Sequence, residues 1–440
     1  MTQRTKGFSA SGWLCILLLL PLLAGCAPTP QANVLGYLVG EELGGNRAGP
    51  PSGWGTIEGR VEMDGRPAPG VSVLVAERTG EPHAATTDSQ GHYRIERVPP
   101  GQYVVAAVGA QSEESSLTGG WGIPWLVTVQ DGQVSVAPHL LLQPHVAPLL
   151  PSDLAASVEL WAGVVYTAAA PFPAGSVARV QAFSFQRAGQ RIDTLRVYRP
   201  LEDRAEPLPL IFGLFPGSID GWSPVSVAFA AAGYVVIALS PSGSRGLDVY
   251  AHAEDARTVL HLARQGALGV DVADVPAVAM GGSFSSAILH RLLRDEGEAF
   301  AAWVTVGGIS NAFSGSADFY AGRLDIPDPY GLVIPALGPA NVFPVPFLRF
   351  SPVYTAAHLP PTLIIHTDAD AIIPINQAYQ LEAALRAANV PVEVFYYRDV
   401  SHYLQIGEDI TEAGQAMYWL VMDFVYRYTQ PTESRPARNE

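Results

Sequence analysis

Residues 275–287 read VPAVAMGGSFSSA, and ILHRLL follows at 288–293. The apolar run that ends at residue 280 predicts a buried strand, and the pattern after Ser286 predicts a helix. A serine on a sharp strand-to-helix turn needs small residues two positions before and two positions after it, so that the strand and the helix can pack closely. Gly281 and Ser285 hold these positions around Ser283. The stretch therefore predicts a nucleophilic serine at the edge of a sheet.

Apolar runs and helical patterns alternate through residues 180–430. Such alternation is typical of an α/β fold with a mostly parallel sheet and helices on both faces. Residues 311–350 interrupt the alternation and are rich in aromatic side chains, so we expect a cap insertion over the site there. The same aromatic side chains are equally compatible with simple packing of the insertion onto the sheet. The predicted strands lie at 208–214, 233–239, 275–280, 301–306, 361–366 and 392–397, and the main helical patterns at 255–264, 376–388 and 411–428.

Two later predicted strands are followed by the acid and the histidine that a serine nucleophile requires. The predicted strand 361–366 leads to Asp368 and Asp370, and the strand 392–397 leads to His402. The chain order serine, acid, histidine is the order of the catalytic triad in the α/β-hydrolase fold. The pattern therefore predicts general-base activation of the serine by the histidine, with a carboxylate behind it.

The amino-acid composition excludes several catalytic mechanisms and one class of metal site. Lys6 is the only lysine, and Cys15 and Cys26 are the only cysteines, so neither residue type occurs after residue 26. Lysine Schiff bases, cysteine nucleophiles and zinc sites built from several cysteines are therefore excluded there. We expect no metal and no organic cofactor, and the net charge of −15 argues against nucleic acid as a partner. A second serine after a strand, Ser310, precedes a poor helix start, so Ser283 is the preferred nucleophile.

The N-terminus predicts export. Arg4 and Lys6 precede the apolar run 14–23, which is too short to span a membrane. The run ends in Leu-Ala-Gly-Cys26, which resembles the bacterial lipoprotein signal, and this resemblance implies lipidation of Cys26 and a lipid anchor in the membrane of the cell envelope. By resemblance to lipoprotein sorting signals, Ala27 after the cysteine implies the outer membrane as the destination in a Gram-negative host. An ordinary cleaved signal is the alternative.

Residues 54–145 hold short strands between Gly and Pro turns, as a small all-β sandwich does. Their pattern T-D-x-x-G-x-Y-x-I…P-P-G-x-Y at 87–103 resembles the carboxypeptidase regulatory-like domain. A spacer or glycan-binding role is possible for this domain, but a structural appendage is the simpler interpretation. The expected boundaries are a signal peptide at 1–25, a Pro- and Gly-rich tether at 26–53, the sandwich at 54–145, a linker at 146–179, the hydrolase domain at 180–430 and a flexible tail at 431–440.

Residues 180–430 resemble an α/β-hydrolase of the prolyl-oligopeptidase/dienelactone-hydrolase type. Gly281-Gly-Ser-Phe284 resembles the G-G-S-Y-G-G turn of that family, and His366…Asp370-Ala-Ile-Ile-Pro374 resembles its H-G-x-x-D-x-x-V-P loop. Ser401-His402 resembles its G-H turn. This chain departs from the pattern at three glycine positions, which hold Ser285, Thr367 and Ser401, and Pro216 replaces a histidine near the expected oxyanion hole.

The resemblance implies specific roles. It selects Asp370 rather than Asp368 as the acid that orients His402, and it makes His366 a structural residue of the acid loop. The backbone N–H of Phe284 and one near Gly217–Ser218 would bind the oxyanion. The chain would then hydrolyse an ester or peptide substrate of small size through an acyl-enzyme on Ser283. The alternative is an inactive hydrolase-fold lipoprotein that acts as a binding module, and the three replaced glycines favour it.

Overall fold

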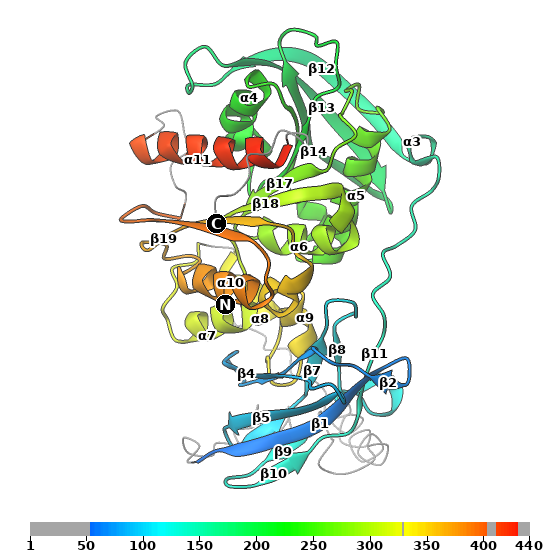
Figure 1. Cartoon of the computed structure of the whole chain (residues 1–440), viewed down its shortest axis with the longest axis vertical. Helices are drawn as coiled ribbons and strands as arrows, with labels where there is room; N and C mark the ends of the chain where they lie inside the picture. The colour runs from blue at the N-terminus through cyan, green and yellow to red at the C-terminus, as the bar shows by residue number, and fades with distance from the viewer. Residues whose placement is uncertain (1–52, 328–329, 403–410, 430–440) are drawn as a thin grey trace, which may run out of the picture. The chain divides into compact units, whose positions relative to one another are not determined.

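The computed structural model describes residues 53–327, 330–402 and 411–429 (Figure 1). The expected signal peptide, the lipidation site Cys26, nearly all of the tether and the C-terminal tail lie outside these residues. The chain divides into two compact units, Met1–Pro144 with Leu337–Val345, and His145–Ala336 with Pro346–Glu440. Among the described residues, no helix is both long and apolar enough to cross a membrane.

The first unit is the expected all-β sandwich. Strand β1 (Gly55–Met63) pairs antiparallel with β5 (His92–Val98) and parallel with β10 (Val134–Val136) and β11 (Leu140–Leu142). Inward side chains of β1 and β5, such as Ile57 and Ile95, share one buried cluster with Val73 and Val75 of the second sheet. The remaining strands are β2 (Arg66–Pro67), β3 (Ser72–Ala76), β4 (Pro82–Thr86), β6 (Gly101–Tyr103), β7 (Ala106–Val108), β8 (Ser115–Ser116) and β9 (Val127–Val129).

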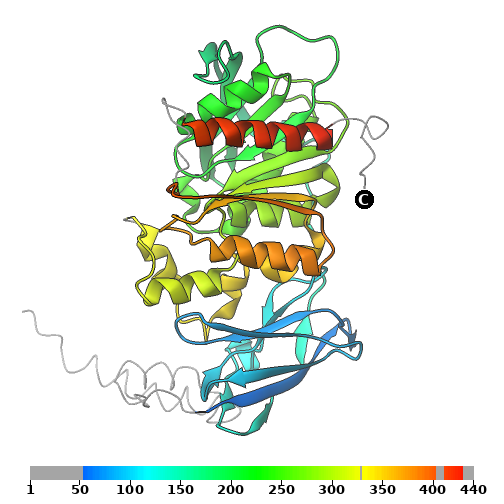
Figure 2. The ribbon, with the colours of Figure 1, turned by 60° about the vertical axis from the view of Figure 1, so that its left-hand side comes forward.

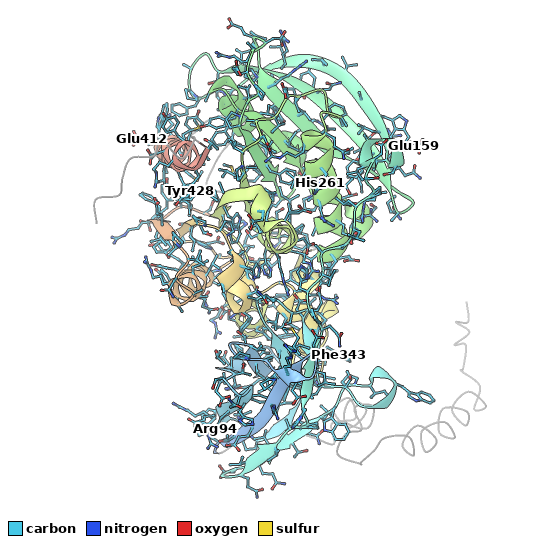
Figure 3. The ribbon with its side chains drawn as sticks, turned by 45° about the vertical axis from the view of Figure 1, so that its right-hand side comes forward. Arg94, Glu159, His261, Phe343, Glu412 and Tyr428 are labelled. Atoms are coloured by element: carbon cyan, nitrogen blue, oxygen red, sulfur yellow. The ribbon has the colours of Figure 1, made fainter. Side chains whose placement is uncertain are left out.

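A segment far along the chain completes this unit. Leu337–Val345 belongs to the sandwich unit, although it lies in the last third of the expected insertion. Val342 is buried with Val104 and Leu126 in a small apolar cluster. The Val104 N–H donates to the carbonyl oxygen of Asn341 at 2.8 Å, and the Asn341 side-chain amide donates to the carbonyl oxygen of Gln102 at 3.0 Å. The neighbouring Phe343, labelled in Figure 3, is 37% exposed.

The second unit is built on one nine-stranded mixed sheet in the order β12-β13-β14-β16-β15-β17-β18-β19-β20. The first three strands are antiparallel to their neighbours, and the strands from β15 to β20 are parallel. Their bounds are β12 Glu159–Ala169, β13 Val177–Arg187, β14 Gln190–Pro200, β15 Leu210–Leu214, β16 Val235–Leu239, β17 Ala277–Gly282, β18 Phe300–Val306, β19 Thr362–Thr367 and β20 Val392–Tyr397.

Helices cover both faces of this sheet, as the α/β-hydrolase fold requires (Figure 1). Helices α4 (Ser223–Ala231) and α11 (Glu412–Thr429) lie side by side on one face, where Phe229 and Phe424 share a buried cluster with strand residues (Figure 2). Glu412 and Tyr428 lie near the two ends of α11 (Figure 3). Helices α5 (Val249–Arg264) and α6 (Ser285–Asp295) pack together on the other face. The remaining longer helix, α10, spans Asn376–Ala387.

Two sequence predictions need correction. The expected linker 146–179 contains α3 (Leu154–Ser157) and the edge strand β12, which pairs with β13. Most side chains of β12 are exposed and none is buried, so it carries no alternation of buried and exposed residues that a sequence pattern could reveal. The insertion expected at 311–350 does not belong to one unit, because Leu337–Val345 is part of the sandwich unit. It contains the helices α7 (Ala312–Tyr320), α8 (Val333–Ala336) and α9 (Pro344–Leu348).

Candidate active site

Ser283 lies on the sharp turn between β17 and α6. Its φ is +48°, a left-handed conformation that is uncommon for a residue with a side chain. The two preceding glycines are required by space. A first side-chain carbon at Gly281 would lie 2.5 Å from the Leu214 carbonyl oxygen, and one at Gly282 would lie 2.0 Å from the Val306 carbonyl oxygen. The sequence stretch that predicted the turn is therefore explained by close backbone packing.

The turn is fixed by the segment that follows β18. The Ser283 N–H donates to the Gly307 carbonyl oxygen at 3.1 Å, and the Ile309 N–H donates to the Ser283 carbonyl oxygen at 3.2 Å. Gly307 has a φ of +55°, and a side-chain carbon there would lie 3.5 Å from two atoms of the His402 ring. Sequence reasoning missed Gly307 as a site residue, and the Gly307-Gly308 pair at a strand end was the signal that could have found it.

The structure brings three of the predicted side chains into one hydrogen-bonded row. His402 Nε2 lies 3.2 Å from Ser283 Oγ, and His402 Nδ1 lies 2.7 Å from Asp370 Oδ2. The Asp370 side chain is fully buried, whereas the His402 side chain is 11% exposed. A hydroxyl, an imidazole and a buried carboxylate in this order can transfer the hydroxyl proton to the imidazole.

The Asp370 carboxylate is held by its own loop. Its Oδ1 accepts hydrogen bonds from the N–H groups of Ile372 and Ile373, at 2.9 and 2.8 Å, which leaves Oδ2 for His402. His366 lies behind it, with Nε2 4.0 Å from Asp370 Oδ2. Burial lowers the pKa of His366, and its Nδ1 accepts the Thr367 N–H at 2.9 Å. His366 therefore lies beside the acid without a hydrogen bond to it.

The two rival residues have other partners. Ser310 is 1% exposed, and its hydroxyl donates to the Gln377 carbonyl oxygen. Asp368 is exposed, and its Oδ1 accepts the Asp399 N–H at 2.9 Å. Neither side chain is in the hydrogen-bonded row, so the geometry distinguishes both rivals from Ser283 and Asp370.

The three residues expected at the oxyanion hole lie on two turns. Among the described residues, no acceptor contacts the backbone N–H groups of Phe284, Gly217 or Ser218. Phe284 follows the nucleophile candidate and precedes the first turn of α6. Gly217 has a φ of +73°, and its turn is held by Trp222, whose ring N–H donates to the Pro216 carbonyl oxygen at 2.8 Å. Backbone N–H groups that have no acceptor within their own turn are suited to binding a developing oxyanion.

Aromatic side chains surround the position after Ser283. The Phe284 ring lies 5.9 Å from the ring of His252 and 5.9 Å from the ring of Phe350, measured between centroids. Most other aromatic residues of the insertion pack against each other, as Phe313 does with Phe347 at 5.2 Å. Packing therefore accounts for more of the aromatic insertion than contact with the site does.

A small apolar cavity of about 40 Å³ lies behind the turn, between the sheet and the helices α4 and α11. Almost all of its exposed lining atoms are apolar, so it favours hydrocarbon over water. Its lining includes Gly281 of β17 and Val306 of β18. Its other lining includes Phe215, Trp222, Met280 and Met417. Within the described part of the chain, no cluster of three or more His, Cys, Asp or Glu side chains is placed to hold a metal ion.

Comparison with known families agrees with the two domain types. Residues 56–137 match the Carboxypeptidase regulatory-like domain, and residues 273–430 match the Prolyl oligopeptidase family. Both expectations from the sequence are confirmed at this level, and the second part of the chain carries a domain of a serine hydrolase family. Ser283, Asp370 and His402 all fall within the matched range. A search of curated proteins by sequence found no match.

Two solved structures are similar to this chain at low sequence identity. An acylaminoacyl peptidase from Pyrococcus horikoshii is 14% identical with a TM-score of 0.46, and the match covers 83% of this chain and 55% of the peptidase. A thermophilic esterase from Thermogutta terrifontis, with propionate bound, is 20% identical with a TM-score of 0.42, and the match covers 54% of this chain and 92% of the esterase. This chain therefore spans about half the length of the peptidase that it matches.

Proposed function

We propose that this protein is a serine hydrolase that cleaves an ester or amide bond of a small substrate through an acyl-enzyme on Ser283. The observation that carries the proposal is the row formed by Ser283 Oγ, His402 and Asp370, with separations of 3.2 and 2.7 Å. Hydrogen-bond reach between nucleophile and base, and between base and orienting acid, is the geometric requirement for this chemistry.

The reaction proceeds in two displacements. Ser283 Oγ attacks the acyl carbon while its proton passes to His402 Nε2, and the electron pair of the carbonyl bond moves to the oxygen. The backbone N–H groups of Phe284 and of the Gly217–Ser218 turn bind this oxyanion. As the tetrahedral adduct collapses, His402 returns the proton to the leaving group. Water then attacks the acyl-serine by the same route and regenerates the hydroxyl.

Asp370 acts on His402 rather than on the substrate. Its buried carboxylate accepts a hydrogen bond from the His402 Nδ1–H, which leaves Nε2 as the acceptor for the serine proton. The same carboxylate stabilises the imidazolium formed after proton transfer. Asp368 has no part in this row, and the proposal therefore assigns the acid role to Asp370.

Covalent labelling with a fluorophosphonate probe tests the proposal, because the probe reacts with activated serines. We expect labelling of the intact protein and its loss in Ser283→Ala, whereas Ser310→Ala retains it as the matched control. Failure of the folded protein to react would support the inactive binding module instead. A panel of p-nitrophenyl esters beside aminoacyl and prolyl amides then separates an esterase from a peptidase.

The cellular location is part of the same proposal. The Leu-Ala-Gly-Cys26 ending supports export and lipid anchoring in the cell envelope. If Cys26 carries the anchor, Cys26→Ser moves the hydrolase from the membrane fraction to the soluble fraction. An unchanged membrane association in that variant would refute lipid anchoring without affecting the proposed chemistry.

A further inference from the structure

The hydroxyl of Thr367 joins the two segments that carry the acid and the histidine. Thr367 is the last residue of β19, is 1% exposed, and donates from Oγ1 to the Val400 carbonyl oxygen at 2.6 Å. Val400 lies two residues before His402, and Asp370 lies three residues after Thr367. The same Oγ1 accepts the Ala369 N–H at 3.4 Å, at the start of the turn to the acid.

This hydrogen bond acts where strand pairing ends. The parallel register of β19 and β20 stops at the pair formed by Thr367 and Tyr397. Beyond it, the Asp368 N–H donates to the Tyr397 carbonyl oxygen at 3.2 Å, and Asp368 Oδ1 accepts the Asp399 N–H at 2.9 Å. The Thr367 hydrogen bond reaches furthest toward His402, and it is partly buried, whereas the Asp368 contact is exposed.

We infer that Thr367 is a positioning residue, whose hydroxyl holds the His402 segment against Asp370. The inference rests on the proposed function, because it concerns the geometry of the proposed base. It also accounts for a departure from the family pattern, in which glycine is expected at this position. Glycine has no side chain that could reach Val400, so this chain fixes its histidine segment by a contact that the glycine pattern lacks.

The expected loss of rate follows from how little displacement of a catalytic group an active site tolerates. A displacement of about 1 Å in a catalytic group reduces the rate by up to about a hundredfold. Valine has nearly the shape of threonine but cannot donate, so Thr367→Val removes the hydrogen bond and leaves the partly buried Val400 carbonyl oxygen without this partner. Serine keeps the hydroxyl and loses only a methyl group, so Thr367→Ser should rescue the function.

A matched control lies at the other end of the same strand. Thr362 is also 1% exposed, and its hydroxyl donates to the Pro360 carbonyl oxygen at 2.7 Å. Thr362→Val therefore removes a comparable, partly buried hydrogen bond at the end of β19 that is remote from Asp370. The two valine variants should lose similar stability, and a difference between their rates then reports on positioning.

The experiment measures kcat, KM and thermal stability of the full chain and the three variants with a p-nitrophenyl ester. For Thr367→Val we expect kcat to fall by about ten- to a hundredfold with KM changed by less than about threefold. Thr367→Ser and Thr362→Val should keep kcat within about threefold of the parent. An unchanged kcat in Thr367→Val, or an equal loss in Thr362→Val, would overturn the inference.

A second readout does not depend on turnover. A proton shared between His402 Nδ1 and Asp370 is strongly deshielded in proton NMR spectra, and we expect its signal in the parent, Thr367→Ser and Thr362→Val. Its loss or broadening in Thr367→Val alone supports the positioning role. If the parent protein neither reacts with fluorophosphonate nor turns over ester, the proposed function fails. An identical NMR signal in Thr367→Val would separately refute the inference.

Discussion

Replacing Asp370 by asparagine gives the sharpest test of the proposed triad. The substitution keeps the shape of the side chain and removes its charge. The asparagine carbonyl oxygen can keep the hydrogen bonds from Ile372 and Ile373, which now bind Oδ1 at 2.9 and 2.8 Å. Its NH₂ group then faces His402 Nδ1, at the position of the present 2.7 Å contact. Because that group donates, the imidazole must accept at Nδ1 and carry its proton on Nε2.

An imidazole in this tautomer presents a proton to Ser283 and cannot take one from it. We therefore expect Asp370→Asn to lower kcat by about 10⁴, which corresponds to about 5.4 kcal/mol of transition-state stabilisation. The loss should appear in kcat more than in KM, since substrate contacts are unchanged. Steady-state hydrolysis of a p-nitrophenyl ester and the rate constant of fluorophosphonate labelling measure it. Thermal unfolding shows that the variant remains folded.

Asp368→Asn is the matched control. That carboxylate is exposed and accepts the Asp399 N–H, outside the row that contains His402. We expect its kcat to stay within about tenfold of the parent. The assignment of the acid is refuted if Asp370→Asn retains more than about a tenth of the parent activity, or if Asp368→Asn loses more activity than Asp370→Asn.

Two further predictions concern stability. Ser285→Ala should raise the free energy of unfolding by about 1 kcal/mol, because Ser285 Oγ is buried without a hydrogen-bond partner among the described residues. Urea unfolding measures this change, and a lower free energy of unfolding in the variant would contradict the prediction. Val342→Asp should destabilise the sandwich unit by about 3 kcal/mol, because a charge would enter the cluster with Val104 and Leu126. Hydrogen exchange in β6 and β9 reports this loss, and unchanged protection there would count against the discontinuous unit.

The central part of the hydrolase fold could be predicted from the sequence. Strands such as β15 and β16 are buried on both faces, so they appear as continuous apolar runs. β20 was predicted with its observed bounds, Val392–Tyr397. The turn at Ser283 was predictable because close packing admits only glycine at two positions before it, and this constraint is visible in the sequence.

Other features depend on partners that are remote in sequence. β12 is an exposed edge strand, and only its pairing with β13 defines it. The inclusion of Leu337–Val345 in the sandwich unit depends on contacts to Val104 and Leu126, more than two hundred residues earlier in the chain. No local pattern encodes such a contact. Gly307 differs, because the Gly307-Gly308 pair marks a strand end in the sequence, whereas its position beside His402 follows from the pairing of β18, β19 and β20.

The three replaced glycines show why residue type alone does not decide between an enzyme and a binding module. In the sequence, Ser285, Thr367 and Ser401 form one class of departures, and together they favoured an inactive protein. The structure separates them: the Ser285 hydroxyl is buried without a partner, the Thr367 hydroxyl joins the acid and histidine segments, and Ser401 is exposed. Ser285 should affect stability, and Thr367 should affect the position of His402 relative to Asp370. None of the three side chains lies between Ser283 and His402, whose hydrogen bond is present. The binding-module hypothesis thereby loses the observation on which it depended, and only failure of the serine to react could restore it.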